Sequence, residues 1–123
     1  MILVDTSIWI DHLRGTNATL VGLLQTDAVC IHPFIIGELA CGNLGNRKNV
    51  LELLSGLPQL MPANDDEVLH FIEKRSLMGR GNGYIDMHLL AACVLHMTSI
   101  WTRDKRLSAV AEEFGLAYRT DTH

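Results

Sequence analysis

Four acidic side chains have types and positions that suit metal-dependent hydrolysis. Asp5 and Asp104 each follow a short apolar run, Asp86 follows a glycine-rich segment, and Glu38 interrupts an apolar one. Carboxylate oxygens are the ligands that Mg²⁺ and Mn²⁺ prefer. An ion held by such ligands lowers the pKa of its bound water and offsets the negative charge of a phosphate. The four acids therefore predict a Mg²⁺ or Mn²⁺ site, provided that the fold brings them together.

Each of the four acids also has a purely structural interpretation. Asp5 would cap the turn after a strand, and Asp86 and Asp104 would be helix N-caps. Glu38 would lie on a helix face turned to water. Glu38 is the most informative of the four, because an ionised carboxylate among apolar residues is costly unless it is paired or bound to a metal.

The elements that must position these acids alternate between strands and helices. We expect strands at Ile2–Val4, Ala28–Ile31 and Ser99–Thr102, and two weaker ones at Gln59–Met61 and Leu116–Tyr118. Helical periodicity and capping residues predict helices from Thr6 or Ser7 to Arg14, then at Asn17–Gln25, Pro33–Cys41, Arg47–Ser55, Asn64–Leu77, Asp86–His96 and Lys105–Phe114.

This alternation predicts an α/β fold, with a parallel sheet covered by helices on both faces. Ligands in such folds sit beyond the carboxyl ends of the strands. Asp5 and Asp104 would both lie at that edge. The chain has 123 residues, which fits one domain over residues 1–123.

Composition narrows the class of protein. The formal net charge is −4, which disfavours nucleic acid as a partner unless bound cations supply a positive field. Setting the four acids aside leaves the remaining residues neutral. Cys30, Cys41 and Cys93 are odd in number and widely spaced, so we expect buried thiols and no disulfide framework. Because neither a secretory signal nor a membrane span is evident, we expect a cytoplasmic location.

Four motifs in order along the chain resemble those of a known family. MILVDTSIWIDHLRG resembles the opening of a PIN-domain protein of the VapC toxin type, and IIGELACG resembles the segment that carries its helical glutamate. GYIDMHLLAA resembles the third acidic motif, and WTRDKRL the fourth. Each motif alone is weak, but the ordered set is specific and covers nearly the whole chain.

The resemblance implies both a fold and an activity. The fold would be a PIN-like three-layer α/β/α sandwich with a parallel sheet of about five strands. The activity would be Mg²⁺- or Mn²⁺-dependent endoribonuclease cleavage of RNA. The protein would be the toxin of a type II toxin–antitoxin pair with a VapB-like antitoxin, as a homodimer or a larger assembly. Operator DNA would be reached only through the antitoxin, and no membrane would be involved.

Carried over onto this sequence, the resemblance assigns the catalytic and metal-binding roles to Asp5, Glu38, Asp86 and Asp104. Thr6 resembles the hydroxyl residue that follows the first aspartate. We expect Thr6 and Ser7 to support the acids without binding the metal themselves.

The sequence departs from the family pattern near its last motif. Many members have an acid two residues after the final aspartate and then an aromatic residue, where this chain has Arg106 and Leu107. An extra carboxylate from that loop is therefore not expected. His88 replaces a more usual apolar or small residue, and we interpret it as a surface residue or one that supports a ligand.

Basic residues flank three of the acidic motifs. Arg14, Arg80 and Arg103 are candidates to hold RNA phosphates, and solvated surface charge is the alternative for each. Three apolar residues of the segments after Glu38 are candidates for a homodimer seam or an antitoxin groove, with core packing as the alternative: Leu44, Val50 and Leu54.

Other classes of protein fit less well. A haloacid dehalogenase-type phosphoryl-transfer enzyme needs a second aspartate where this chain has Ser7. A receiver-like signalling domain needs an acidic pair after the first strand, and Asp5 stands alone there. A Cys–His hydrolase lacks a cysteine at a strand end. A catalytically silent PIN-fold interaction protein remains an alternative, for which calorimetry would show no Mn²⁺ binding.

Overall fold

Three short parallel strands form the centre of the fold in a computed structural model that describes residues 1–120. The order is β2 (Val29–Cys30), β1 (Ile2–Val4), β3 (Ser99–Trp101). In the register, Leu3 is paired with Cys30 on one side and with Ile100 on the other. Leu3 is fully buried, as expected for a central strand with helices on both faces.

The sheet is shorter than the resemblance implies. In the described part of the chain, the two weaker predicted strands form only single parallel bridges. Gln59 pairs with Ile31 beyond β2, and Ala117 pairs with Ile100 beyond β3. Both segments thus lie where a fourth and a fifth strand were predicted, without extending into strands.

Seven helices complete the described fold, each within three residues of its predicted bounds. They are α1 (Thr6–Arg14), α2 (Ala18–Gln25), α3 (Pro33–Ala40), α4 (Arg47–Ser55), α5 (Asp65–Lys74), α6 (Tyr84–Leu95) and α7 (Lys105–Glu113).

Local chemistry explains where several helices begin. Asn64 and Glu67 form a capping box at the start of α5. Pro33 occupies the first turn of α3, and the His32 ring accepts a hydrogen bond from the Phe34 N–H.

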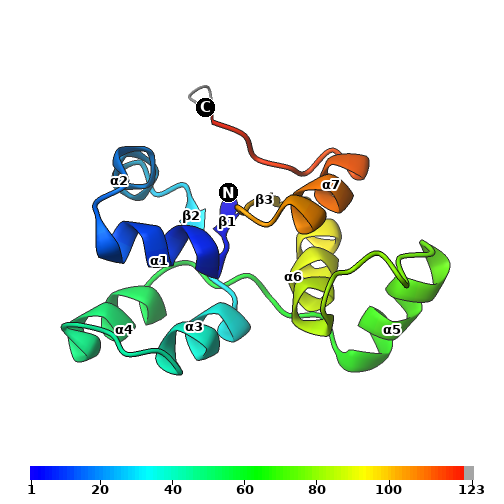
Figure 1. Ribbon diagram of the computed structural model, residues 1–123, viewed down its shortest axis with the longest axis horizontal. Helices are drawn as coiled ribbons and strands as arrows, with labels where there is room; N and C mark the ends of the chain where they lie inside the picture. The colour runs from blue at the N-terminus through cyan, green and yellow to red at the C-terminus, as the bar shows by residue number, and fades with distance from the viewer. Residues whose placement is uncertain (121–123) are drawn as a thin grey trace.

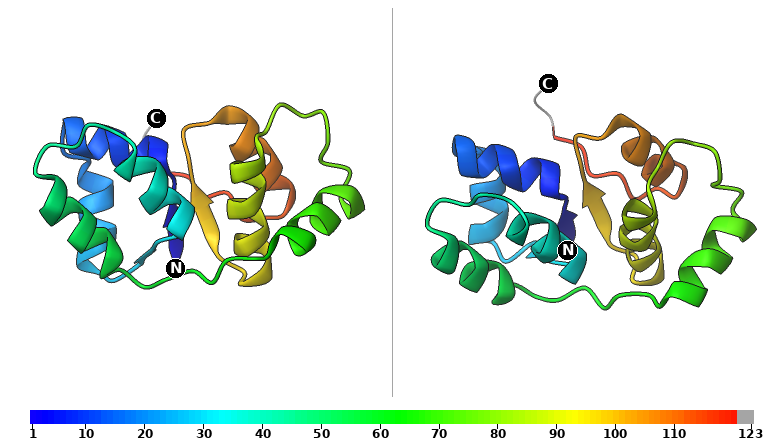
Figure 2. Two further views of the ribbon diagram at one scale, coloured as in Figure 1. Left: turned by 90° about the horizontal axis from the view of Figure 1, so that it is seen from below. Right: turned by 60° about the horizontal axis from the view of Figure 1, so that its bottom comes forward.

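The helices flank the sheet on both sides. Figure 1 shows α1 to α4 gathered on one side of the strands and α5 to α7 on the other, and both views in Figure 2 keep this division. Helix α6 is the most enclosed, since every residue from Met87 to Cys93 is buried. The predicted α/β architecture, with a parallel sheet between helices, is confirmed.

One prediction about exposure needs correction, that of Cys41, and core packing is confirmed for two of the three apolar residues weighed as an interface. Cys30 and Cys93 are buried as expected, but Cys41 is exposed. Leu54 is fully buried and belongs to the core, while Val50 packs against it. None of the helices within residues 1–120 has the length and hydrophobicity that a membrane crossing requires.

Candidate active site

The carboxyl ends of β1 and β3 bring the first and last acidic motifs to one edge of the sheet. Asp5 directly follows β1, and its backbone N–H donates to the carbonyl oxygen of Trp101, the last residue of β3 (2.9 Å). Asp104 lies three residues farther along, at the start of α7. Parallel pairing therefore fixes the positions of Asp5 and Asp104 relative to each other, as the sequence predicted.

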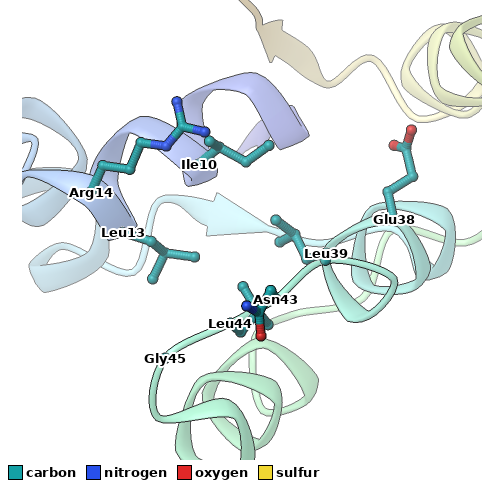
Figure 3. A pocket seen from close by; sticks show the side chains of 9 residues that line it. Ile10, Leu13, Arg14, Glu38, Leu39, Asn43, Leu44 and Gly45 are labelled. Carbon is teal, nitrogen blue, oxygen red and sulfur yellow. The ribbon is translucent and has the colours of Figure 1, made fainter.

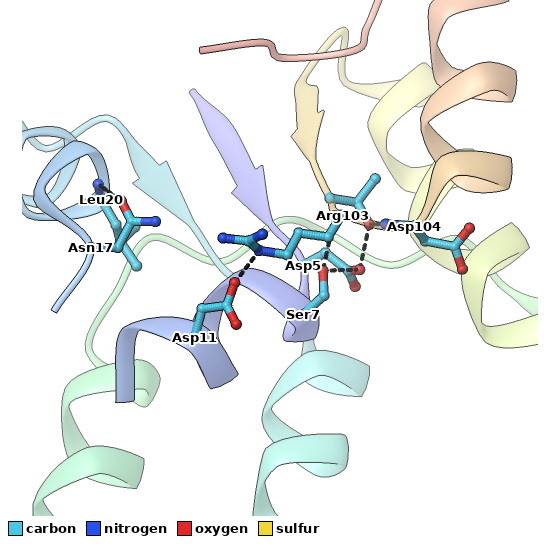
Figure 4. Close-up of polar contacts among 8 residues, drawn as sticks. Asp5, Ser7, Asp11, Asn17, Leu20, Arg103 and Asp104 are labelled. Atoms are coloured by element: carbon cyan, nitrogen blue, oxygen red, sulfur yellow. Dashed lines mark hydrogen bonds and ion pairs between the residues drawn. The ribbon is translucent and has the colours of Figure 1, made fainter. Parts of the chain in front are cut away.

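Asp5 is a buried carboxylate held by hydroxyl groups, with 8% of the residue exposed. Thr102 Oγ1 donates to Asp5 Oδ2 at 2.7 Å, and Ser7 Oγ donates to the same oxygen at 3.1 Å. Figure 4 shows Asp5 beside the end of β1 with a dashed line to Ser7. Among residues 1–120, no hydrogen bond reaches Asp5 Oδ1, so this oxygen keeps its full capacity as a ligand.

Backbone groups of the last motif hold the two hydroxyls in place. The Arg103 N–H donates to Ser7 Oγ (3.1 Å), and the Asp104 N–H donates to Thr102 Oγ1 (3.0 Å). Ser7 is therefore in contact with Asp5, where the supporting role predicted for it would place it. Thr102 was missed from the sequence, although a hydroxyl residue at the end of the strand that precedes Asp104 is the signal that could have identified it.

Asp104 serves as the N-cap of α7. Its Oδ1 accepts hydrogen bonds from the N–H groups of Arg106 (2.9 Å) and Leu107 (3.1 Å). The interpretation of Asp104 as a helix N-cap is therefore correct, but capping uses only one of its two carboxylate oxygens. Within the described residues no hydrogen bond reaches Oδ2, which leaves that atom free to bind an ion.

Asp86 lies in the first turn of α6, two residues inside the helix rather than at its cap. Its Oδ2 accepts a weak hydrogen bond from the Gly83 N–H (3.4 Å). Burial is the main reason why the pKa of Asp86 is raised, and the bond from Gly83 partly opposes that shift. The negative charges of three further carboxylates also raise the pKa of Asp86, each by less than burial does: Asp5, Asp104 and Glu38. The other three predicted acids therefore lie close enough to act on the charge of Asp86.

Glu38 is exposed, so the expectation that it would be a charge trapped among apolar residues is wrong. Ile35 and Leu39 are buried and share one face of α3, whereas Glu38 projects from another. It is nevertheless attached to the site, because Thr6 Oγ1 donates to Glu38 Oε1 at 2.8 Å. Thr6 is therefore in contact with Glu38, where the supporting role predicted for it would place it.

The donor set fits a hard divalent cation. All four candidate side chains are carboxylates, and their mutual repulsion would be relieved by positive charge. Within residues 1–120, no three or more His, Cys, Asp or Glu side chains are arranged to hold an ion as they stand. Binding would therefore require the side chains to turn inward.

His88 is buried, so the prediction of a surface position is wrong. Its Nε2 lies 2.9 Å from Asp65 Oδ1, and the Tyr84 hydroxyl donates to the same oxygen at 2.8 Å. Hydrogen bonds from Tyr84 and His88 lower the pKa of Asp65. The His88 ring also packs on Phe34, with centroids 4.8 Å apart. His88 thus links α6, which carries Asp86, to α5 and α3.

The glycine-rich segment before α6 is fastened to α7. Arg80 makes a two-pronged ion pair with Glu113, with one contact at 2.9 Å. Gly81 has a positive φ of 86°, and a Cβ at this position would lie 2.7 Å from Arg106 Nη1. The side chain of Arg106 therefore packs in the space beside Gly81 that a Cβ would occupy. Arg106, which stands where many family members have an acid, thus has a structural role here.

The three arginines proposed to bind RNA differ in their surroundings. Arg80 is paired with Glu113, and Arg103 Nε is paired with Asp11. Asp11 was also missed from the sequence. Arg14 has no acidic partner within residues 1–120.

A groove of about 270 Å³ runs beside Glu38. Figure 3 shows Ile10 and Arg14 of α1 in the upper part of the view, Leu13 on the left, Leu39 across from it on the right, and Leu44 below. Ile10 and Leu13 are 37% and 40% exposed. The wall of the groove is therefore partly apolar and accessible.

Comparison with known proteins identifies the family. The family model of the PIN domain matches residues 2–113. The chain is 48% identical over 118 residues to "Ribonuclease VapC32" from Mycobacterium tuberculosis strain CDC 1551 / Oshkosh, and equally to that of strain ATCC 25618 / H37Rv. The alignments cover 95% of this chain and 95% of each relative. The chain therefore belongs to the PIN-domain family, and within it to the VapC ribonucleases.

Proposed function

We propose that this protein is a toxin endoribonuclease that cleaves RNA with a divalent cation, Mg²⁺ or Mn²⁺, held by Asp5, Asp86, Asp104 and Glu38. The observation that carries the proposal is the hydrogen bonding that joins the acidic motifs: Thr102 Oγ1 donates to Asp5 and accepts from the Asp104 N–H, and Thr6 donates to Glu38. The charges of Asp5, Asp104 and Glu38 also raise the pKa of Asp86. Both observations support one shared pocket built from four distant motifs. The family relationship supports RNA as the substrate.

The residues of the chain would divide the work as follows. The two hydroxyls on Asp5 Oδ2 would orient its carboxylate and leave Oδ1 available to the ion. Asp86 binds from α6 on the other side, while Asp104 and Glu38 complete the site directly or through water. When bound, the ion supplies an activated water and stabilises negative charge on the phosphate.

A protein partner follows from the same family assignment. We infer a VapB-like antitoxin, and the groove beside Glu38 is its proposed seat. The accessible side chains of Ile10 and Leu13 would receive an apolar segment, which would then extend toward the acidic pocket. A dimeric or larger assembly, and contact with operator DNA through the antitoxin alone, are further parts of this proposal.

The decisive experiment removes one carboxylate. Asp5→Asn should abolish cleavage of a fluorescent RNA in Mg²⁺ or Mn²⁺ and should weaken Mn²⁺ binding in calorimetry. Asp27→Asn is a matched control, because Asp27 is exposed, precedes β2 at the opposite edge of the sheet and has a φ of 55° that asparagine tolerates. Cleavage by Asp5→Asn at the unmodified rate would refute the proposal. Absence of Mn²⁺ binding by the unmodified protein would instead favour a silent interaction protein.

A further inference from the structure

A second cavity, of about 350 Å³, lies beside the acidic pocket. Its walls come from the end of β3, the first two turns of α7 and the segment after α7. The polar residues that line it are Thr102, Arg103, Lys105, Ser108, Glu112 and Arg119. Three cations face one anion here, although the whole chain carries a net charge of −4. The cavity is therefore a local reversal of the overall charge.

Two residues belong to both the cavity and the acidic pocket. Thr102 lines the cavity while its hydroxyl donates to Asp5 Oδ2 at 2.7 Å. Arg103 lines the cavity while its backbone N–H donates to Ser7 Oγ. A chain of phosphates bound in the acidic pocket would therefore continue into the cavity without crossing another element.

The cations of the cavity differ in availability. Arg119 is paired with Glu112 at 2.6 Å, and Arg103 is paired with Asp11. Lys105 makes no ion pair with any residue of the described chain and is exposed. The hydroxyl of Ser108 lies one turn farther along α7. Lys105 is therefore the cation best able to meet a new anion, and Glu112 is the group that opposes it.

We propose that this cavity binds a backbone phosphate of the RNA adjacent to the one that is cleaved. The proposal rests on the proposed function, since it assumes RNA in the neighbouring pocket. Lys105 supplies an unpaired ammonium group, and Arg119 becomes a second donor when the phosphate competes with Glu112. The contacts involve only phosphate oxygens, so they position the strand without reading its sequence.

The test uses two variants with opposite expected signs. Affinity for a short, unstructured, fluorescein-labelled RNA is measured by anisotropy over a series of salt concentrations, in an Asp86→Asn background that prevents cleavage. Lys105→Ala should weaken binding about fivefold at roughly 0.1 M salt and should reduce the slope of log affinity against log salt by about 0.7. Glu112→Gln should tighten binding, because it removes the opposing charge and frees Arg119.

Lys48→Ala is the matched control, since Lys48 is an exposed lysine of α4, far from the cavity along the chain. It should leave both affinity and slope unchanged. The proposal is overturned if Lys105→Ala matches Lys48→Ala, or if Glu112→Gln fails to tighten binding. Cleavage of the same RNA by the unmodified protein with Mn²⁺ is measured separately. Cleavage combined with an unchanged Lys105→Ala affinity rejects the cavity alone and leaves the nuclease proposal standing.

Discussion

Thr102 offers a quantitative test of how the buried carboxylate of Asp5 is held. Replacing it with valine keeps the shape of the side chain but removes the hydroxyl that donates to Asp5 Oδ2 at 2.7 Å. Asp5 is only 8% exposed, so water cannot fully replace the lost donor. A hydrogen bond to a charged group contributes about 1.5–3 kcal/mol. The Asp104 N–H loses its acceptor too, but Asp104 is exposed and water can take that place.

We therefore expect Thr102→Val to lower the free energy of unfolding by about 2 kcal/mol. For a chain of 123 residues, this corresponds to a fall in Tm of roughly 6–8 °C. The assay is thermal unfolding followed by circular dichroism in EDTA. Thr102→Ser keeps the hydroxyl and should recover most of the loss.

A second background shows whether the loss comes from Asp5. In Asp5→Asn the carboxylate charge is absent, so Thr102→Val should cost clearly less than in the unmodified protein. An equal loss in both backgrounds, or an unchanged Tm in the first, would show that the hydroxyl does not stabilise the ionised carboxylate.

Three further predictions follow from the same contacts. Asp86→Asn should abolish cleavage yet raise the Tm measured in EDTA. Because the folded pKa of Asp86 is raised, the unmodified protein loses stability as pH rises from the unfolded pKa of about 4 through the folded pKa. The gain in Tm should therefore grow as pH rises above about 4, and a constant gain would contradict this sign. Thr6→Val should weaken Mn²⁺ binding with little change in Tm, since the exposed Glu38 loses only its orienting hydrogen bond. Thr6→Ser keeps the hydroxyl and should bind Mn²⁺ normally, and calorimetry should distinguish the two variants. Burial, with a smaller effect of the charge on His88, lowers the pKa of His32 from 6.5 to about 4. The stability that is present above pH 6.5 is therefore lost as pH falls toward about 4. His32→Asn keeps an acceptor for the helix cap and should lose less stability over this range in pH-dependent melts.

The sequence predicted the edge of the sheet where the site forms, because strand ends and the acids that follow them are local features. Asp5 and Asp104 lie where parallel pairing requires. The start of α6 was placed two residues late, since Asp86 resembled an N-cap. Its carboxylate instead reaches back from the first turn to the Gly83 N–H. A carboxylate at either position accepts a hydrogen bond from a backbone N–H at the start of the helix, so the residue type alone does not separate them.

Other features depend on contacts between distant segments. Thr102 meets Asp5 across 97 positions of sequence, and His88 meets Asp65 across 23. A local pattern can mark Thr102 as a candidate, but strand order and helix packing decide which residue it contacts. The misjudged exposure of Glu38 is different, because it was readable from the sequence. Ile35 and Leu39 are four residues apart and define the buried face of the helix, which leaves Glu38 outside it.

The fastening of the glycine-rich segment also governs how the ion-free molecule behaves. Arg80 and Arg106 join the chain ahead of α6 to α7. The segment that leads into Asp86 is therefore anchored to the helix that begins after Asp104. These contacts oppose an outward movement of the segment, which would carry Asp86 away from Asp104. The rearrangement that ion binding requires is thus confined to the carboxylate side chains, on a backbone that these contacts already hold in place.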